Sequence, residues 1–105
     1  MTPREIFETR LPGNLNKEKA EKIGGTFQFT VTGDNGGTWH VDLTKDADWV
    51  GEGALDDAKC KITIADADWV GIFEGSVNPQ MAFMSGKLKV AGDMSLALKL
   101  QSLIS

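Results

Sequence analysis

Apolar and polar residues alternate one by one in four separate segments of the chain. In residues 26–32, Phe27, Phe29 and Val31 are apolar and the residues between them are polar; residues 38–44, 60–64 and 87–90 follow the same rule. Successive side chains of a strand point to opposite sides, so each segment predicts a strand with one buried face. Strands with one polar face are typical of antiparallel sheets. Gly33–Gly37 joins the first two strands and predicts a hairpin turn.

Four other segments have the spacing of helices. Residues 3–23 form the first, with a break or kink expected within 11–16, where Pro12 and Gly13 interrupt the pattern. The second is expected over 66–74. The third starts at the Asn78–Pro79 pair and ends near Gly86, because asparagine caps helices and proline suits their first turn. The last begins after Asp93 and runs to the C-terminus.

The hexapeptide DADWVG occurs twice, at 46–51 and at 66–71, and its neighbours predict two different structures. In the second copy, Ile72 and Phe73 follow Trp69 at helical spacing, and Asp66 is the expected N-cap of this helix. In the first copy, Glu52 and Gly53 take the corresponding positions and offer no apolar stripe. The first copy is therefore predicted as a turn before a short strand, and the two copies are no architectural repeat.

Few residues of the chain are suited to catalysis or to metal binding. The single histidine, His40, is expected on the polar face of its strand and the single cysteine, Cys60, on the apolar face, so the two should not pair. The first hexapeptide partly matches a calcium loop, but Val50 occupies a position that needs an oxygen ligand. No phosphate-binding glycine loop is present. The sequence predicts no catalytic residue, no metal and no cofactor.

Length and charge narrow the class of protein further. A chain of 105 residues predicts one domain, 1–105. The net charge of −4 argues against a nucleic-acid partner, since such partners require many lysine and arginine contacts. One cysteine fits a reducing compartment, and neither a signal peptide nor a membrane span is apparent, so we expect a cytoplasmic protein.

The last 27 residues contain more apolar side chains than a helix lying on a sheet requires. In the final helix the polar residues Ser95, Lys99 and Ser102 share one narrow stripe, and Met81, Phe83 and Met84 crowd the short helix before it. Four explanations remain open at this point. These helices complete the core, line a lipid pocket, form a dimer seam or face a membrane.

Four motifs of the C-terminal half resemble the sterol carrier protein 2 family of lipid-binding domains. They are CKITIADAD at 60–68, NPQMAF at 78–83, GKLKVAG at 86–92 and LALKLQ at 96–101. The segments KIGGTFQF at 22–29 and TWHVDL at 38–43 are similar to the first two strands of that family. The resemblance covers nearly the whole chain and is looser from Asp46 to Asp57.

The resemblance implies an α+β fold, in which helices cover one face of a five-stranded, mainly antiparallel sheet and enclose an apolar tunnel. It implies a non-enzymatic lipid-binding or transfer protein with broad specificity for fatty acids, fatty acyl-CoAs, phospholipids or sterols. It also implies that Gln80 gives the ligand a polar contact, whereas Leu98 stands where some relatives have a glutamine. The ligand-binding residues expected from it are Gln80, Met81, Phe83, Met84, Leu98, Leu103, Trp39 and Phe73.

Other partners follow from the same features. The alternative function is an interaction module whose apolar last helix dimerises or docks on a lipid-metabolising enzyme. A hydrolase acting on a bound thioester would need His40 or an acidic residue in the tunnel. Transient membrane contact is expected to be weak, because the chain is acidic with a pI near 4.8. The ending Leu-Ile-Ser lacks the peroxisomal tripeptide found in some relatives, so that address is not predicted.

Overall fold

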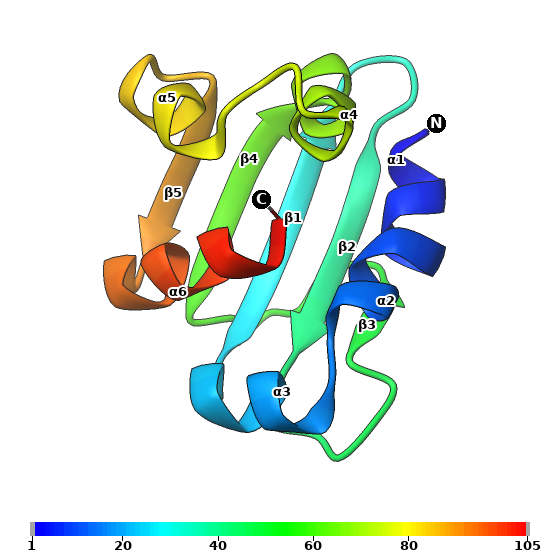
Figure 1. The fold of residues 1–105 in the computed structure, drawn as a ribbon, viewed down its shortest axis with the longest axis vertical. Helices are drawn as coiled ribbons and strands as arrows, with labels where there is room; N and C mark the ends of the chain where they lie inside the picture. The colour runs from blue at the N-terminus through cyan, green and yellow to red at the C-terminus, as the bar shows by residue number, and fades with distance from the viewer. Residues whose placement is uncertain (1, 105) are drawn as a thin grey trace.

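The sheet of this protein has five strands, and its helices lie over one face of it (Figure 1). The structure is a computed structural model that describes the backbone of residues 2–104 and the side chains of residues 2–100. The strands are β1 (Thr26–Thr32), β2 (Gly37–Asp42), β3 (Val50–Glu52), β4 (Cys60–Ala65) and β5 (Leu88–Gly92), in the spatial order β3-β2-β1-β4-β5. The predicted α+β class with a mainly antiparallel sheet is confirmed.

One strand pair differs from the antiparallel pattern expected from the alternation. The central strands β1 and β4 run parallel, with Phe29 opposite Ile62, whereas the other three pairs are antiparallel. A half-buried strand has the same alternation whichever way its neighbour runs, so the direction could not be read from it. The buried faces of both central strands still coincide, because Phe27, Phe29, Ile62 and Ile64 are all at most 2% exposed.

The N-terminal helical region is divided within 11–16 as expected: the break lies at Leu15–Asn16, and Pro12 and Gly13 are helical. Helices α1 (Pro3–Glu5), η1 (Ile6–Arg10) and α2 (Leu11–Asn14) follow one another without interruption, and η1 has π-helical hydrogen bonds. Pro12 fits because it stands in the first turn of α2. Helix α3 (Lys17–Ile23) follows, capped by the Asn16 side chain and ended by Gly24 in the left-handed conformation.

The two DADWVG copies adopt the two structures predicted for them. The first forms a turn that leads into β3, and the second forms the start of α4 (Asp66–Glu74). The expected N-cap was wrong, however, since Ala65 occupies that position and Asp66 is the first helical residue. The Asp66 carboxylate instead accepts a hydrogen bond from the backbone N–H of Asn35, at 3.1 Å. It thereby ties α4 to the β1–β2 turn.

The C-terminal elements form as their capping residues predict. Helix α5 (Pro79–Met84) begins with the Asn78 side chain accepting hydrogen bonds from the N–H groups of Gln80 and Met81. Helix α6 (Met94–Ile104) begins with Asp93, whose carboxylate accepts from the N–H groups of Ser95 and Leu96. Both helices lie over the β4 and β5 side of the sheet (Figure 1).

An aromatic cluster fills the other side of the core. The Phe7 ring stacks on the indoles of Trp39 and Trp69, with centroids 4.9 and 5.1 Å away, and meets Phe29 edge to face at 5.4 Å. Phe7 is 1% exposed and Trp69 is fully buried. This aromatic cluster (Phe7, Phe29, Trp39 and Trp69) joins the N-terminal helices, β1, β2 and α4.

Replacing the central ring of this cluster should strongly destabilise the fold. Phe7→Ala removes a buried ring with three aromatic neighbours, so we expect the free energy of unfolding to fall by about 3–5 kcal/mol. Phe83→Ala is the matched control, because Phe83 is 38% exposed, and we expect a loss of at most about 1 kcal/mol. Urea unfolding measures both. Equal losses in the two variants would contradict this assignment of the core.

Candidate functional site

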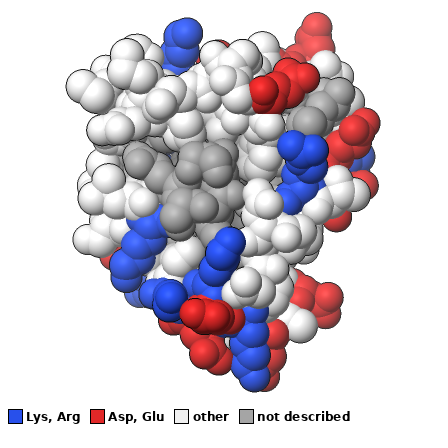
Figure 2. All heavy atoms as spheres, in the orientation of Figure 1, with Lys and Arg blue, Asp and Glu red and all other residues white. Residues whose placement is uncertain are grey.

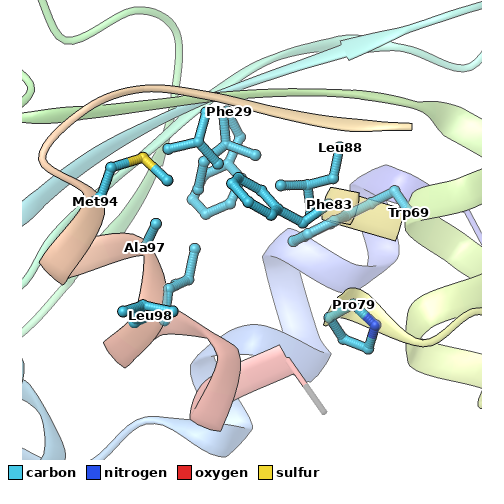
Figure 3. A pocket seen from close by; sticks show the side chains of 11 residues that line it. Phe29, Trp69, Pro79, Phe83, Leu88, Met94, Ala97 and Leu98 are labelled. Carbon is cyan, nitrogen blue, oxygen red and sulfur yellow. The ribbon is translucent and has the colours of Figure 1, made fainter. Parts of the chain in front are cut away.

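An apolar pocket lies between α5, α6 and the sheet (Figure 3). Figure 3 shows Met94, Ala97 and Leu98 on one side of the space and Trp69, Phe83 and Pro79 on the other. None of the described residues that line the pocket is ionisable. They are Phe29, Ile62, Trp69, Pro79, Phe83, Leu88, Val90, Met94, Ala97, Leu98 and Leu100.

The pocket follows from the periodicities of the elements around it. Phe29, Ile62 and Leu88 come from neighbouring strands and share the covered face, because register pairs Phe29 with Ile62 and Ile64 with Leu88. From α6, Met94, Ala97 and Leu98 recur at helical spacing and so share a face. From α5, Pro79 and Phe83 are four residues apart and do the same. The sheet supplies the floor of the pocket and the two helices supply its walls.

The pocket is narrow in this state of the protein, and its rim is apolar. Its cavity volume is about 40 Å³, within about 460 Å³ of empty space that includes the open mouth. Pockets that bury a drug-sized ligand have volumes of roughly 300–1,000 Å³. Three of the lining residues, Phe83, Met94 and Leu98, are exposed and form this rim, whereas Met81 and Met84 of α5 are exposed without lining the pocket. A long ligand therefore requires the walls to move apart, and the exposed rim gives them apolar surface to offer.

Two of the residues expected to bind a ligand line this pocket, and three others of the same helices do not. Phe83 and Leu98 are in its wall. Gln80 and Met84 are exposed and lie outside it, and Met81 borders a separate shallow groove beside Ser85 and Lys87. The reason is the short length of α5, in which Pro79 and Ala82 face the core and the intervening positions face outward.

The remaining three predicted residues lie elsewhere or outside the description. Trp39 stacks on Phe7 and lies under the Arg4 guanidinium, 5.0 Å from its ring centroid, so it belongs to the aromatic cluster and not to the pocket. Phe73 packs edge to face on Trp69 at 5.0 Å, behind the pocket wall. The backbone of Leu103 is in α6, but its side chain lies outside the described residues.

Sequence reasoning missed most of the wall that the sheet and α4 contribute. Phe29, Ile62 and Leu88 were recognised as inward-facing strand residues, yet they were assigned to the core alone. Trp69 was recognised only as part of the repeated hexapeptide. The shared inward face of the strands was the available signal. The strand pattern does not show that α5 and α6 lie over the β4–β5 end of that face.

The two residues with potential for chemistry are separated by the sheet. His40 is on its uncovered face, where Nδ1 lies 3.1 Å from the carbonyl oxygen of Gly53. Cys60 is fully buried on the covered face, and burial, with a smaller contribution from Asp93, raises the pKa of its thiol to about 11. Neither lines the pocket. Among residues 2–100, no cluster of histidine, cysteine and acidic side chains is suited to hold a metal ion.

The matches with known proteins agree with this geometry. The family model of the SCP-2 sterol transfer family matches residues 6–105. The chain belongs to this family. It is 47% identical over 90 residues to sterol carrier protein 2 of Rattus norvegicus, covering 83% of this chain and 16% of the relative. It is 39% identical over 102 residues to hydroxysteroid dehydrogenase-like protein 2 of Xenopus laevis, covering 96% and 24%.

A solved structure of the family has the same fold. The solution structure of palmitated SCP2L2 from Aedes aegypti superimposes with a TM-score of 0.79 at 26% identity, covering 99% of this chain and 95% of that one. The chain spans less than a quarter of the length of the two curated relatives. No helix within the described residues is both long and apolar enough to cross a membrane.

The buried thiol gives a test of how the covered face of β4 is shielded from water. Its pKa of about 11 exceeds the usual value of 9.0, so between these pH values the unfolded chain releases the thiol proton while the folded chain retains it. The free energy of unfolding should therefore fall as pH rises from 9 to 11, by at most about 3 kcal/mol.

Cys60→Ala lacks this proton and should show a shallower decline, since the two proteins are otherwise identical. Denaturant unfolding at several pH values from 8 to 11 measures the difference. Identical slopes for the two proteins would show that the thiol is not shielded as described.

Proposed function

We propose that this chain is a non-enzymatic lipid-binding and transfer domain that holds a long apolar chain between α5, α6 and the sheet. The observation that carries the proposal is the uncharged pocket with its exposed apolar rim. Membership of the SCP-2 sterol transfer family supports it, and the relative from Aedes aegypti is described as palmitated. The lining described above includes no acid–base pair that could hydrolyse a bound ester or thioester.

The hydrophobic effect is sufficient for useful affinity. Burying one methylene contributes about 0.8 kcal/mol, so ten shielded methylenes contribute about 8 kcal/mol before the cost of association is subtracted. Affinities in the micromolar range follow. An apolar wall discriminates only weakly between ligands of different shape. We therefore infer that fatty acids, fatty acyl-CoAs, phospholipids and sterols compete for the same space.

Binding requires the pocket to widen, and α6 is the element that we expect to move. Its first turn is fixed, because the N–H of Asp93 donates to the carbonyl oxygen of Lys59 at 2.9 Å. Leu96 is also seated on Gly25, where a Cβ would lie only 2.6 Å from a Leu96 methyl. Leu98 lies beyond this anchor and is 66% exposed. We therefore infer that α6 pivots about its first turn and moves Leu98 away from Phe83.

A membrane is the proposed source and destination of the lipid. The chain has an uneven charge distribution, with a net charge of +2 over residues 79–105 and −6 over residues 1–78. The exposed large apolar residues among those described are all in the positive part. Much of the upper left of the face in Figure 2, where α5 lies, is free of charged side chains. We infer that this end of the molecule contacts anionic bilayers despite the acidic net charge.

The same exposed residues support one alternative function. Met94 and Leu98 of α6 are 45% and 66% exposed, which would also suit burial against a second copy or a lipid-metabolising enzyme. Light scattering at several concentrations separates these functions. A monomer that binds lipid supports the carrier, whereas a permanent dimer that does not respond to lipid supports the interaction module.

A charge placed in the pocket wall should abolish most lipid binding. Leu98→Glu puts a carboxylate where the bound chain would lie, so we expect the affinity for a fluorescent fatty acid to fall at least about tenfold. Stability should change little, because Leu98 is 66% exposed. Leu55→Glu is the matched control, since Leu55 lies in the loop after β3 and outside the pocket. Equal affinities for all three proteins, or no saturable binding to the wild type, would contradict the proposal.

Membrane contact has its own test, independent of lipid uptake. Lys87 lies beside the exposed Met81 in the shallow groove along α5, whereas Lys17 is in α3 at another end of the molecule. We expect Lys87→Glu to weaken binding to vesicles that contain phosphatidylserine about thirtyfold, because the reversal changes two charges at about 1 kcal/mol each, and Lys17→Glu to have little effect. Vesicle co-sedimentation at low and high salt measures this. Equal weakening by both variants would point to net charge alone.

A further inference from the structure

One polar atom of the pocket wall lacks a hydrogen-bond partner. Trp69 is fully buried, and its indole Nε1 is bonded to no acceptor among the described residues. Buried polar groups are nearly always hydrogen-bonded, because leaving a donor unpaired costs free energy. The indole of Trp49 shows the usual situation, since its Nε1 donates to the carbonyl oxygen of Lys45 at 2.9 Å. The unpaired N–H of Trp69 therefore requires an explanation.

The described side chains around Trp69 offer it no oxygen or nitrogen acceptor. Its ring neighbours are Phe7, Phe29 and Phe73, with centroids 5.0 to 5.3 Å away. The other ten described residues of the pocket wall have hydrocarbon or thioether side chains. A water molecule is also unsuited to this space, because buried waters need two to four polar partners. A molecule that enters the pocket could supply the acceptor that the described residues do not.

We propose that the indole N–H of Trp69 donates a hydrogen bond to an uncharged oxygen of the bound lipid. This inference rests on the proposed lipid-binding function and names the ligand class. The indole is a donor only, so it selects an acceptor such as a hydroxyl or an ester carbonyl. A carboxylate is disfavoured at this depth, since the described wall contains no cation to compensate its burial.

Trp69, and not Gln80, would then contact the polar group of the ligand. Gln80, expected in that role from the family resemblance, is exposed and lies outside the pocket. Trp69 lies across the pocket from Met94 and Leu98 (Figure 3). The oxygen-bearing end of the lipid would thus lie against α4, and its apolar chain would extend toward the rim formed by α6. Trp69 would be the residue that sets specificity.

Nuclear magnetic resonance of the indole N–H groups tests this directly in the wild-type protein. We expect the Trp69 indole proton to move downfield on addition of 1-dodecanol, and to move much less with dodecane, which has no oxygen. The Trp49 indole proton serves as the internal reference, because its hydrogen bond to Lys45 is outside the pocket. Dodecanoate at pH 8 should move the Trp69 indole proton as little as dodecane does, because its carboxylate is disfavoured at the depth of Trp69.

Trp69→Phe provides the affinity arm, since phenylalanine keeps a ring and removes the donor. We expect the affinity for dodecanol to fall about tenfold more than the affinity for dodecane. Comparing the two losses removes the effect of the smaller ring, because that effect acts on both ligands. Trp49→Phe is the matched control and should leave the ratio unchanged.

The outcomes separate the two claims. If neither dodecanol nor dodecane binds the wild type, the proposed function fails. If both bind but the Trp69 proton responds equally to each, the hydrogen-bond proposal is overturned while lipid binding stands. Should Trp69→Phe not fold, the wild-type spectra still decide.

Discussion

The stacking of Phe7 between the N-terminal helices and the sheet is the contact on which the rest of the structure depends. Phe7 is the member of the aromatic cluster that touches the other three rings. The cluster covers the β1–β2 side of the sheet with rigid rings, and no large apolar residue among the described side chains, 2–100, is exposed there. The N-terminal half of the molecule thus supplies stability and a fixed framework.

The opposite end of the same sheet face is covered less completely. There, α5 and α6 bring mostly aliphatic side chains over Ile62 and Leu88, and the exposed large apolar residues gather at this end. The short helix α5, and α6 beyond its anchored first turn, should cost less free energy to displace than an element held by stacked rings. If the proposed function holds, the division between a rigid half and a more easily displaced half would allow the protein both to stay folded and to admit a lipid. Trp69 belongs to both halves, since it stacks on Phe7 and lines the pocket.

The sequence was most informative where local chemistry decides structure. Alternation predicted the strands, and the neighbours of DADWVG distinguished a turn from a helix. It was least informative where distant segments meet: the parallel pairing of β1 with β4, and the Asp66 carboxylate, which accepts from Asn35 as well as from Ala67 in its own helix. The apolar excess of the last two helices indicated the pocket, yet among the expected residues whose side chains are described only Phe83 and Leu98 line it. Which side of a six-residue helix faces inward depends on how Pro79 and Ala82 pack, and no period reveals that.

The account depends on the space between α5 and α6 opening to receive an apolar chain. Nuclear Overhauser contacts between a bound, protonated dodecyl chain and the methyl groups of an otherwise deuterated protein test this most directly. The account predicts contacts to the methyls of Leu88, Leu98 and Leu100, and none to those of Val41, which is buried on β2 outside the pocket. Saturable binding with contacts to Val41, and none to Leu98 or Leu100, would contradict it.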